Sequence, residues 1–249
     1  MDKKKLKIIL LIAGQGKRIR NLTNLPKCFL KINKKSILER NIENFQKLKT
    51  SNVVLVTGYK SDLIKKILHK NDLLNFNIKY NKFYKEYGNS YSIYLALSSI
   101  NYDKTVILDG DLIYDFKILK NFILQDNKNS VLVGNGSIKD IECAKVLVKK
   151  NKTIHKIIDK SGIRKSLLKK VKFVGEAPGM IKFNKNGLVK FKNSLKKFFK
   201  LKKNIKLNWE HAINYYCLNN QLYYFKTKSN KWIEVDNLND YKKALKKFS

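Results

Sequence analysis

The sequence KIILLIAGQGKRIRNLTNLPK occupies residues 7–27 and decides the fold of the chain. Its first part, Lys7–Ala13, is continuously apolar from Ile8 and has the length of a buried strand. Gly14 and Gly16 follow at once, and basic residues come directly after them. Glycines let backbone N–H groups approach phosphate oxygens with no Cβ in the way. The stretch therefore predicts a strand that runs into an anion-binding turn.

Two other phosphate-binding motifs begin in a similar way but do not fit. The dinucleotide fingerprint G-x-G-x-x-G needs a third glycine where this chain has Ile19, and an acidic residue about 20 residues further on at the tip of the second strand, where none is found. A P-loop needs G-K-S/T at a fixed spacing, which is absent. Arg18 and Lys27 could still neutralise a triphosphate. A plain strand–turn–helix connection is the alternative without a ligand.

The rest of the chain alternates strand and helix patterns, which is typical of an α/β fold. Short β-branched or apolar runs predict strands, and apolar residues at helical spacing predict helices. The predicted strands lie at Lys7–Ala13, Val53–Thr57, Ile78–Tyr80, Thr105–Leu108, Ser130–Val133, Ala144–Val148, Thr153–Ile158, within Lys172–Phe183, and at Leu222–Phe225 and Trp232–Val235. The predicted helices are Ser36–Leu48, Ser61–His69, Ser90–Ser99, Asp115–Leu124, Gly187–Phe199, Trp209–Leu218 and Leu238–Phe248.

The net charge of +35 favours anionic ligands. Of the 54 basic residues only four are Arg, and the lysines are spread along the whole chain. A dedicated nucleic-acid binder would use more Arg for bidentate phosphate and base contacts. Abundant Lys, Asn and Ile are also what an AT-rich genome produces. We therefore expect that the protein requires no nucleic acid as a partner.

The three cysteines and the start of the chain indicate the compartment. Cys28, Cys143 and Cys217 are too few and too scattered for a disulfide framework or a zinc site, which fits a reducing environment. The apolar run Ile8–Ala13 is too short for a signal peptide and lacks a small-residue cleavage pattern. No stretch reaches the roughly 20 apolar residues of a membrane span. We expect a cytoplasmic protein of unknown oligomeric state.

Asp109 and Asp111 flank Gly110 directly after the predicted strand Thr105–Leu108. Side chains at the carboxyl end of a strand in an α/β sheet lie where ligands bind. Carboxylate oxygens suit Mg²⁺, which usually binds through one or two of them together with phosphate oxygens. A tight turn is the alternative, because Asp-Gly is common in turns.

The N-terminal segment resembles the pattern L-A-A-G-x-G-x-R-x-x-x-x-T-x-x-x-P-K of the sugar-nucleotide and cytidylyl transferases. Residues 11–27 read LIAGQGKRIRNLTNLPK. The resemblance implies the nucleotidyltransferase fold, a Rossmann-like, mixed but mainly parallel α/β sheet flanked by helices. The positions in register are Leu11, Ala13, Gly14, Gly16, Arg18, Thr23, Pro26 and Lys27.

The resemblance also implies roles for single residues. In the family the glycine loop wraps the triphosphate, the Arg holds the departing pyrophosphate and the Lys contacts phosphate at the reacting centre, so Arg18 and Lys27 are expected to be catalytic. Asp111 and Asp236 match the two ligands of the family's Mg²⁺, the expected cofactor; capping of the last helix is the alternative for Asp236. Nucleotide contacts are expected from Leu11, Ala13, Gly14, Gly16, Lys17, Arg18, Asn89, Ser90 and Asp109.

Three later segments resemble the phosphocholine and 2-aminoethylphosphonate cytidylyltransferases. Asn89–Leu95, NSYSIYL, is similar to their N-x-Y-S-L-Y-L helix start, which lies at the base and ribose, although the family commonly has two adjacent Asn residues there. Val174–Met180 resembles V-G-E-x-x-G, and Trp209–Ile213 resembles Y-E-D-A with His211 in place of Asp. Acceptor contacts are expected from Lys145, Glu176, Trp209 and Glu210, and Lys145 is also expected to be catalytic.

Together these resemblances imply a CTP-dependent cytidylyltransferase. It would transfer CMP to a small phosphorylated or phosphonate acceptor, of phosphocholine or 2-aminoethylphosphonate type, and release pyrophosphate. One domain over residues 1–249 is expected, with a nucleotide-binding half at 1–135 and an acceptor-binding half at 136–249. Two alternatives stay open: a sugar-1-phosphate nucleotidyltransferase that uses UTP, dTTP or GTP, and a basic RNA-binding protein on a degenerate transferase fold.

Overall fold

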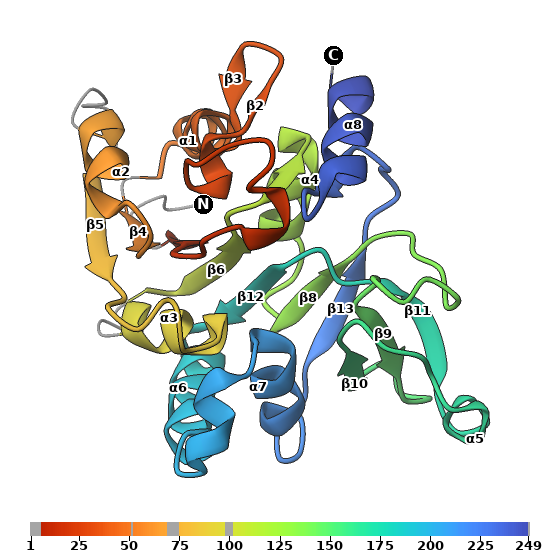
Figure 1. The fold of residues 1–249 in the computed structure, drawn as a ribbon. Helices are drawn as coiled ribbons and strands as arrows, with labels where there is room; N and C mark the ends of the chain where they lie inside the picture. The colour runs from red at the N-terminus through yellow and green to blue at the C-terminus, as the bar shows by residue number, and fades with distance from the viewer. Residues whose placement is uncertain (1–5, 51, 69–74, 98–101, 249) are drawn as a thin grey trace.

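A seven-stranded sheet forms the centre of the computed structural model, which describes residues 6–50, 52–68, 75–97 and 102–248 (Figure 1). In spatial order its strands are β13 (Tyr223–Lys226), β8 (Ser130–Val133), β12 (Met180–Asn184), β6 (Lys104–Asp109), β1 (Leu6–Ile12), β4 (Asn52–Thr57) and β5 (Asn75–Tyr80). β12 is antiparallel to both of its neighbours, and the other strands run in one direction. The predicted fold, a mixed but mainly parallel sheet, is confirmed.

Helices cover both faces of this sheet because alternate side chains of each strand point to opposite sides. On one face Ile9 and Leu11 of β1 pack with a group of three helices, and on the other face Ile8 and Leu10 pack with a second group. Full burial of each such side chain contributes roughly 1.5–3 kcal/mol. The first group is α3 (Asn89–Ala96), α6 (Lys185–Phe198) and α7 (Trp209–Tyr216), and the second is α1 (Ile37–Leu48), α2 (Ser61–Leu68) and α4 (Phe116–Leu124).

The second half of the chain adds a smaller antiparallel sheet. Its strands, in spatial order, are β10 (Ile154–Ile158), β9 (Lys145–Val148) and β11 (Lys172–Glu176). The predicted hairpin of β9 and β10 is confirmed by their antiparallel pairing. A backbone bridge joins the two sheets, because the N–H of Gly134 donates to the carbonyl of Glu176 at 2.8 Å.

A two-stranded pairing joins distant parts of the chain at the edge of the main sheet. β7 (Leu112–Tyr114) follows β6 directly and pairs antiparallel with β14 (Trp232–Glu234). The pairing continues past β14, because the N–H of Val235 donates to the carbonyl of Asp111 at 3.1 Å. The pairing therefore brings the residues after β14 to the carboxyl end of β6.

The last helix, α8 (Leu238–Lys247), begins at a capping box formed by Asn237 and Asp240. The side chain of Asn237 accepts from the N–H of Asp240, and the carboxylate of Asp240 accepts from the N–H of Asn237. Since Asn237 caps the helix, the side chain of Asp236 is not used for this purpose.

Most of the predicted elements are confirmed to within one or two residues. His69 and residues 98–99, at the ends of two predicted helices, lie outside the described residues. The elements that the sequence did not predict are short: β2 (Lys31–Ile32), β3 (Lys35–Ser36), β7 and α5 (Lys165–Leu168). In the part of the chain that the structure describes, we find no helix with both the length and the apolar character needed to cross a membrane.

Candidate active site

A cavity of about 340 Å³, called here the first cavity, opens at the carboxyl ends of β1 and β6. Ligands of mainly parallel α/β sheets bind at this edge. The cavity wall combines residues from both halves of the chain. The predicted site residues that line it are Leu11, Ala13, Gly14, Gly16, Lys17, Arg18, Lys27, Asn89, Asp109, Asp111, Glu210 and Asp236.

The glycine turn, residues 14–18, contains two glycines with different structural requirements. Gly16 has a φ of +61°, a left-handed conformation that suits glycine. An added Cβ at Gly14 would meet nothing within 4 Å. The fold therefore requires a glycine at 16 but leaves room at 14, on the cavity wall.

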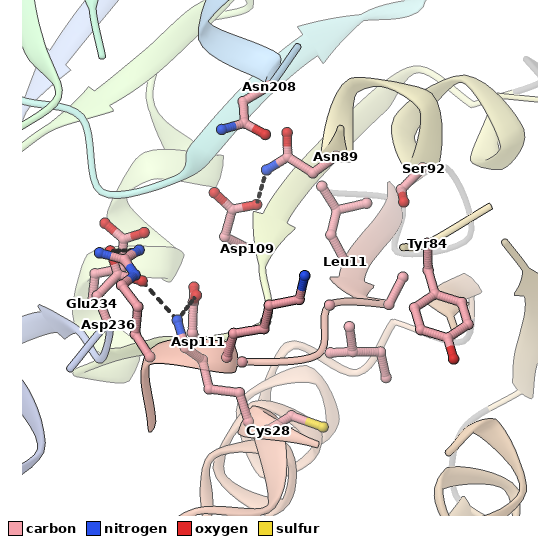
Figure 2. Close-up of a pocket in the computed structure, with 18 of the residues that line it drawn as sticks. Leu11, Cys28, Tyr84, Asn89, Ser92, Asp109, Asp111, Asn208, Glu234 and Asp236 are labelled. Carbon is pink, nitrogen blue, oxygen red and sulfur yellow. Dashed lines mark hydrogen bonds and ion pairs between the residues drawn. The ribbon is translucent and has the colours of Figure 1, made fainter. Parts of the chain in front are cut away.

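Lys27 lies between two aspartates that are far apart in the sequence. Its Nζ is 2.6 Å from Oδ2 of Asp111 and 2.7 Å from Oδ1 of Asp236. Figure 2 shows these two aspartates together with Glu234 at one end of the cavity. The β7–β14 pairing explains why they meet, because Asp111 precedes β7 and Asp236 follows β14.

Basic groups surround Asp236. Arg18 lies 2.9 Å from Oδ2 of this aspartate, and Lys160 lies 2.6 Å from the same oxygen. Burial alone would raise the pKa of Asp236, but the ammonium groups of Lys27 and Lys160 lower it well below the usual range. Burial also opposes the charge on Lys27, yet Asp111 and Asp236 raise the pKa of its ammonium group. Both partners therefore stay charged at neutral pH.

The carboxylate cluster, formed by Asp111, Glu234 and Asp236, fits a divalent cation. Each residue offers an oxygen within 4.8 Å of the others. Oδ1 of Asp111 is buried and has no hydrogen-bond partner among the described residues. Burial, followed by the charges of Asp111 and Asp236, raises the pKa of Glu234 well above its ordinary value. Hard oxygen donors of this kind suit Mg²⁺.

The sequence reasoning missed Glu234, although a signal for it was present. Glu234 and Asp236 are two residues apart at the end of a strand, so their side chains are expected on the same side. Lys160 was missed as well. It is one of many lysines in this chain, and nothing in its neighbourhood distinguishes it.

Asp109 sits deeper in the cavity and is held by two donors. Nε1 of Trp209 donates to Oδ2 of Asp109 at 2.9 Å, and Nδ2 of Asn89 donates to Oδ1 at 3.5 Å. Oδ1 of Asn89 accepts in turn from the backbone N–H of Trp209 at 2.8 Å, which fixes the orientation of the amide. Burial and the nearby charge of Asp111 raise the pKa of Asp109 to about 8.

Gly179 makes room for Asp109. The backbone N–H of Asp109 donates to the Gly179 carbonyl at 2.9 Å. The φ of Gly179 is +68°, and an added Cβ would lie 2.3 Å from Oδ2 of Asp109. A side chain here would therefore displace the carboxylate.

The end of the cavity opposite the carboxylate cluster is lined by neutral polar groups that the sequence reasoning also missed. Tyr84 and Ser92 lie there in Figure 2, and Asn81 is a further lining residue. Nδ2 of Asn81 donates to Oγ of Ser92 at 3.0 Å, and Oδ1 of Asn81 accepts from the N–H of Phe83 at 3.0 Å. Ser92 lies one helical turn after Asn89, a spacing that could have indicated it.

Two residues predicted to contact the nucleotide or the acceptor are buried beside the cavity. Oγ of Ser90 donates to the carbonyl of Leu207 at 2.5 Å, which ties α3 to the segment before α7. Trp209 is 2 % exposed and reaches Asp109 through its indole N–H. Neither side chain lines the cavity. Their expected ligand contacts remain predictions, and in this structure both residues support the wall from behind.

The structure also places Lys145 and Glu176 away from the first cavity. The Nζ of Lys145 is buried and donates to the backbone carbonyls of Asp140 and Cys143, the latter at 3.1 Å. Glu176 lies near the same loop. Burial and the charge of Asp140 raise its pKa to about 7. Both side chains contact the loop at residues 140–143, and their expected acceptor contacts remain predictions.

Glu210 is the predicted acceptor residue that does reach the first cavity. It is 8 % exposed, and Oε2 has no hydrogen-bond partner among the described residues. Burial, followed by the charges of Asp159 and Asp109, raises the pKa of Glu210 well above its ordinary value.

Comparison with known proteins gives one family match and several relatives. A family model described as "Domain of unknown function (DUF6564)" matches residues 26–248. The choline-phosphate cytidylyltransferase of Streptococcus pneumoniae is 28% identical over 107 residues, which are 43% of this chain and 44% of that protein. The CTP:phosphoglutamine cytidylyltransferase of Campylobacter jejuni is 26% identical over 157 residues, 61% of this chain and 52% of that protein. The chain thus spans about half the length of these curated relatives.

Among solved structures, the CTP:phosphocholine cytidylyltransferase of Streptococcus pneumoniae superposes with a TM-score of 0.78. The two chains share 20% sequence identity, and the match covers 98% of this chain and 100% of the other. The likeness establishes the fold. The resemblance to nucleotidyltransferases near the phosphocholine branch is confirmed by these relatives, and the structural neighbour shares the fold.

Proposed function

The chain belongs to the DUF6564 family of domains of unknown function. From its site and its relatives, we propose that it is a CTP-dependent cytidylyltransferase. It transfers CMP to a small phosphorylated or phosphonate acceptor and releases pyrophosphate. The observation that supports this proposal most is the contact of Lys27 with both Asp111 and Asp236, beside the glycine turn and in the same cavity.

The nucleotide lies along the first cavity. Its triphosphate follows the glycine turn, where Gly14 leaves room for close approach and the side chains of Lys17 and Arg18 supply positive charge. The base lies toward Tyr84 and Ser92, at the neutral polar end of the cavity. Asn89 and Asp109, which are hydrogen-bonded to each other, contact the base or the ribose.

Asp111 and Asp236, with the help of Glu234, would hold Mg²⁺, which would supply charge neutralisation at the reacting phosphate. Lys27 stays protonated beside these carboxylates and donates hydrogen bonds to a phosphate oxygen at the reacting centre. Arg18 lies on the other side of Asp236 and holds the departing pyrophosphate. Such preorganised charges act most strongly where charge builds up in the transition state.

The chemistry is an in-line displacement at the α-phosphorus. An oxygen of the acceptor's phosphate or phosphonate forms the new P–O bond, and the bond between the α-phosphorus and the bridging oxygen to the β-phosphate breaks. Because the acceptor oxygen is already ionised near neutral pH, no general base is needed. Catalysis then consists of positioning and charge neutralisation.

The acceptor is of the phosphocholine or 2-aminoethylphosphonate type and binds on the side of residues 136–249, in one domain with the nucleotide-binding half. The named relatives act on choline phosphate and on phosphoglutamine, so phosphorylated amines and amides belong in the first panel of acceptors. Glu210, which lines the cavity from this half, places a carboxyl group at the acceptor end.

The experiment that tests the proposal is a matrix of CTP, UTP, dTTP and GTP against a panel of acceptors, read by pyrophosphate release with Mg²⁺. The panel contains phosphocholine, 2-aminoethylphosphonate, phosphoglutamine and sugar 1-phosphates. We expect release with CTP and a non-sugar acceptor, and loss of release in Asp111→Asn. Asp62→Asn, on an exposed carboxylate of α2, is the matched control. Release with a sugar 1-phosphate and another nucleotide would favour the sugar-nucleotide alternative, and release in no combination would contradict the proposal.

A further inference from the structure

We propose that Asp159, Glu210 and His211 form a second metal site, separate from the carboxylate cluster and suited to a divalent transition ion such as Zn²⁺. These three residues are called here the second cluster. Each offers one donor atom, and the donor atoms lie within 4.8 Å of one another. This inference shares Glu210 with the proposed acceptor end, but its test measures metal binding and not turnover, so the two proposals can fail separately.

The second cluster lies in the wall between two cavities. Asp159 and Glu210 line the first cavity. Asp159 and His211 also line a second cavity of about 700 Å³. A metal ion bound here therefore has open space on both sides, through which it can enter and in which water can complete its coordination.

The second cluster contains polar atoms that lack partners, and they point to a ligand. Glu210 is only 8 % exposed, and its Oε2 has no hydrogen-bond partner among the described residues. Nδ1 of the neighbouring His211 is buried and likewise has no partner there. A buried acceptor with no partner destabilises the fold, and a cation bound by the cluster would remove this cost.

The charges around the cluster also favour a cation. No basic side chain of the described residues forms an ion pair with Asp159 or Glu210. Lys160 follows Asp159 in the sequence, but its ammonium group lies 2.6 Å from Asp236 and 3.9 Å from Glu142.

The backbone holds the three donors in place. Glu210 and His211 belong to the first turn of α7, and Asp159 directly follows β10. One residue fastens these elements together, because Oδ1 of Asn214 accepts from the N–H of Ile157 and Nδ2 donates to the carbonyl of the same residue, both at 2.7 Å. Asn214 lies one turn after Glu210. The donors are thus positioned by two rigid elements, as a metal site requires.

The donor set selects the class of metal. Mg²⁺ prefers oxygen ligands, whereas imidazole nitrogen favours Zn²⁺, Co²⁺ and similar ions. The carboxylate cluster offers oxygens only, and the second cluster adds one nitrogen. The two sites are therefore expected to bind different metals in the same protein.

Co²⁺ provides the test, because its visible absorption reports binding and coordination geometry. The purified full chain is titrated with Co²⁺ while excess Mg²⁺ occupies the carboxylate cluster. We expect one equivalent to bind with d–d bands, and Zn²⁺ to displace it. Glu210→Gln and His211→Gln should each weaken Co²⁺ binding at least about 100-fold, with melting temperatures recorded to show that both variants fold.

Two control variants make the outcome decisive. His155→Gln removes another imidazole, on the exposed side of β10, and should leave the bands unchanged. Asp111→Asn should leave them unchanged as well, because it belongs to the other site. Absence of the bands, their persistence in folded His211→Gln, or their loss in Asp111→Asn would each overturn the proposal.

Discussion

The ammonium nitrogen of Lys27 lies 2.7 Å from a carboxylate oxygen of Asp236, a residue 209 positions further along the chain. This ion pair lies in the wall of the first cavity and joins Lys27 to the segment after β14. Both side chains are mostly buried, at 15 % and 13 % exposure. Removal of one partner from a buried pair is costly, because the remaining charge loses its compensation.

Replacement of the central cation should therefore affect both stability and activity. Lys27→Met leaves Asp111 and Asp236 without their shared partner, and we expect a loss of about 3–5 kcal/mol in the free energy of unfolding without Mg²⁺. Added Mg²⁺ should restore more stability in Lys27→Met than in the wild type, and turnover should still fall at least about 100-fold. Chemical denaturation and pyrophosphate release measure the two effects. Lys31→Met, on an exposed lysine, is the control, and near-normal turnover of Lys27→Met would refute its assigned role.

A substitution at Gly14 should affect ligand binding without affecting the stability of the fold. An added Cβ meets nothing within 4 Å, so Gly14→Ala should keep the melting temperature of the wild type. The same methyl group would face the triphosphate, and we expect the KM for CTP to rise at least about 10-fold, equivalent to roughly 1.4 kcal/mol. Steady-state kinetics and thermal melting give the comparison. An unchanged KM would mean that the phosphates do not approach this glycine.

A substitution at Gly179, in contrast, should lower the stability of the fold. Its left-handed φ and the 2.3 Å approach of an added Cβ to Oδ2 of Asp109 predict that Gly179→Ala lowers the free energy of unfolding by about 1–3 kcal/mol. Gly162→Ala is the matched control, since nothing lies within 4 Å of its added Cβ. It should change stability by less than about 0.5 kcal/mol. Equal stabilities of the two variants, measured by urea denaturation, would contradict the close packing at Asp109.

Glu176 should make stability depend on pH. Burial and the charge of Asp140 raise its folded-state pKa to about 7 from an ordinary value of 4.5. The native state then binds the proton more tightly than the unfolded chain does, so the contribution is fully present below pH 4.5 and is lost as the pH rises through 7. Glu176→Gln should remove this pH dependence, which amounts to at most about 3 kcal/mol in the free energy of unfolding. Unfolding free energies measured at pH 4.5 and 8 test this prediction, and Glu86→Gln, on an exposed carboxylate, is the control. The same change in unfolding free energy between the two pH values in wild type and in Glu176→Gln would disprove the prediction.

Local patterns were sufficient for most of the fold. β1 is fully buried along its length, and its continuous apolar run predicted this. Ser36 and Glu39 form a capping box that starts α1 where the helical spacing begins. By contrast, β7 is three residues long and its partner β14 lies more than a hundred residues away. Such a short strand has no period of its own, so a single sequence does not predict it.

The site could be predicted only in part for a similar reason. Asp111 and Asp236 were named from a resemblance, and the sequence contains no local signal that they meet. Ser90 and Lys145 were expected at ligands, but tertiary contacts with the Leu207 carbonyl and with the loop before β9 decide where these two side chains point. Patterns along one segment specify which residues share a face, and they do not specify what lies opposite that face.

The pairing of β7 with β14 also has a consequence during synthesis on the ribosome. β1, β4, β5 and β6 are neighbours in the sheet and can associate while the last part of the chain is still unmade. Asp236 joins Asp111 and Lys27 only after residues 232–236 have emerged and paired. A nascent chain thus carries the glycine turn long before it can complete the carboxylate cluster.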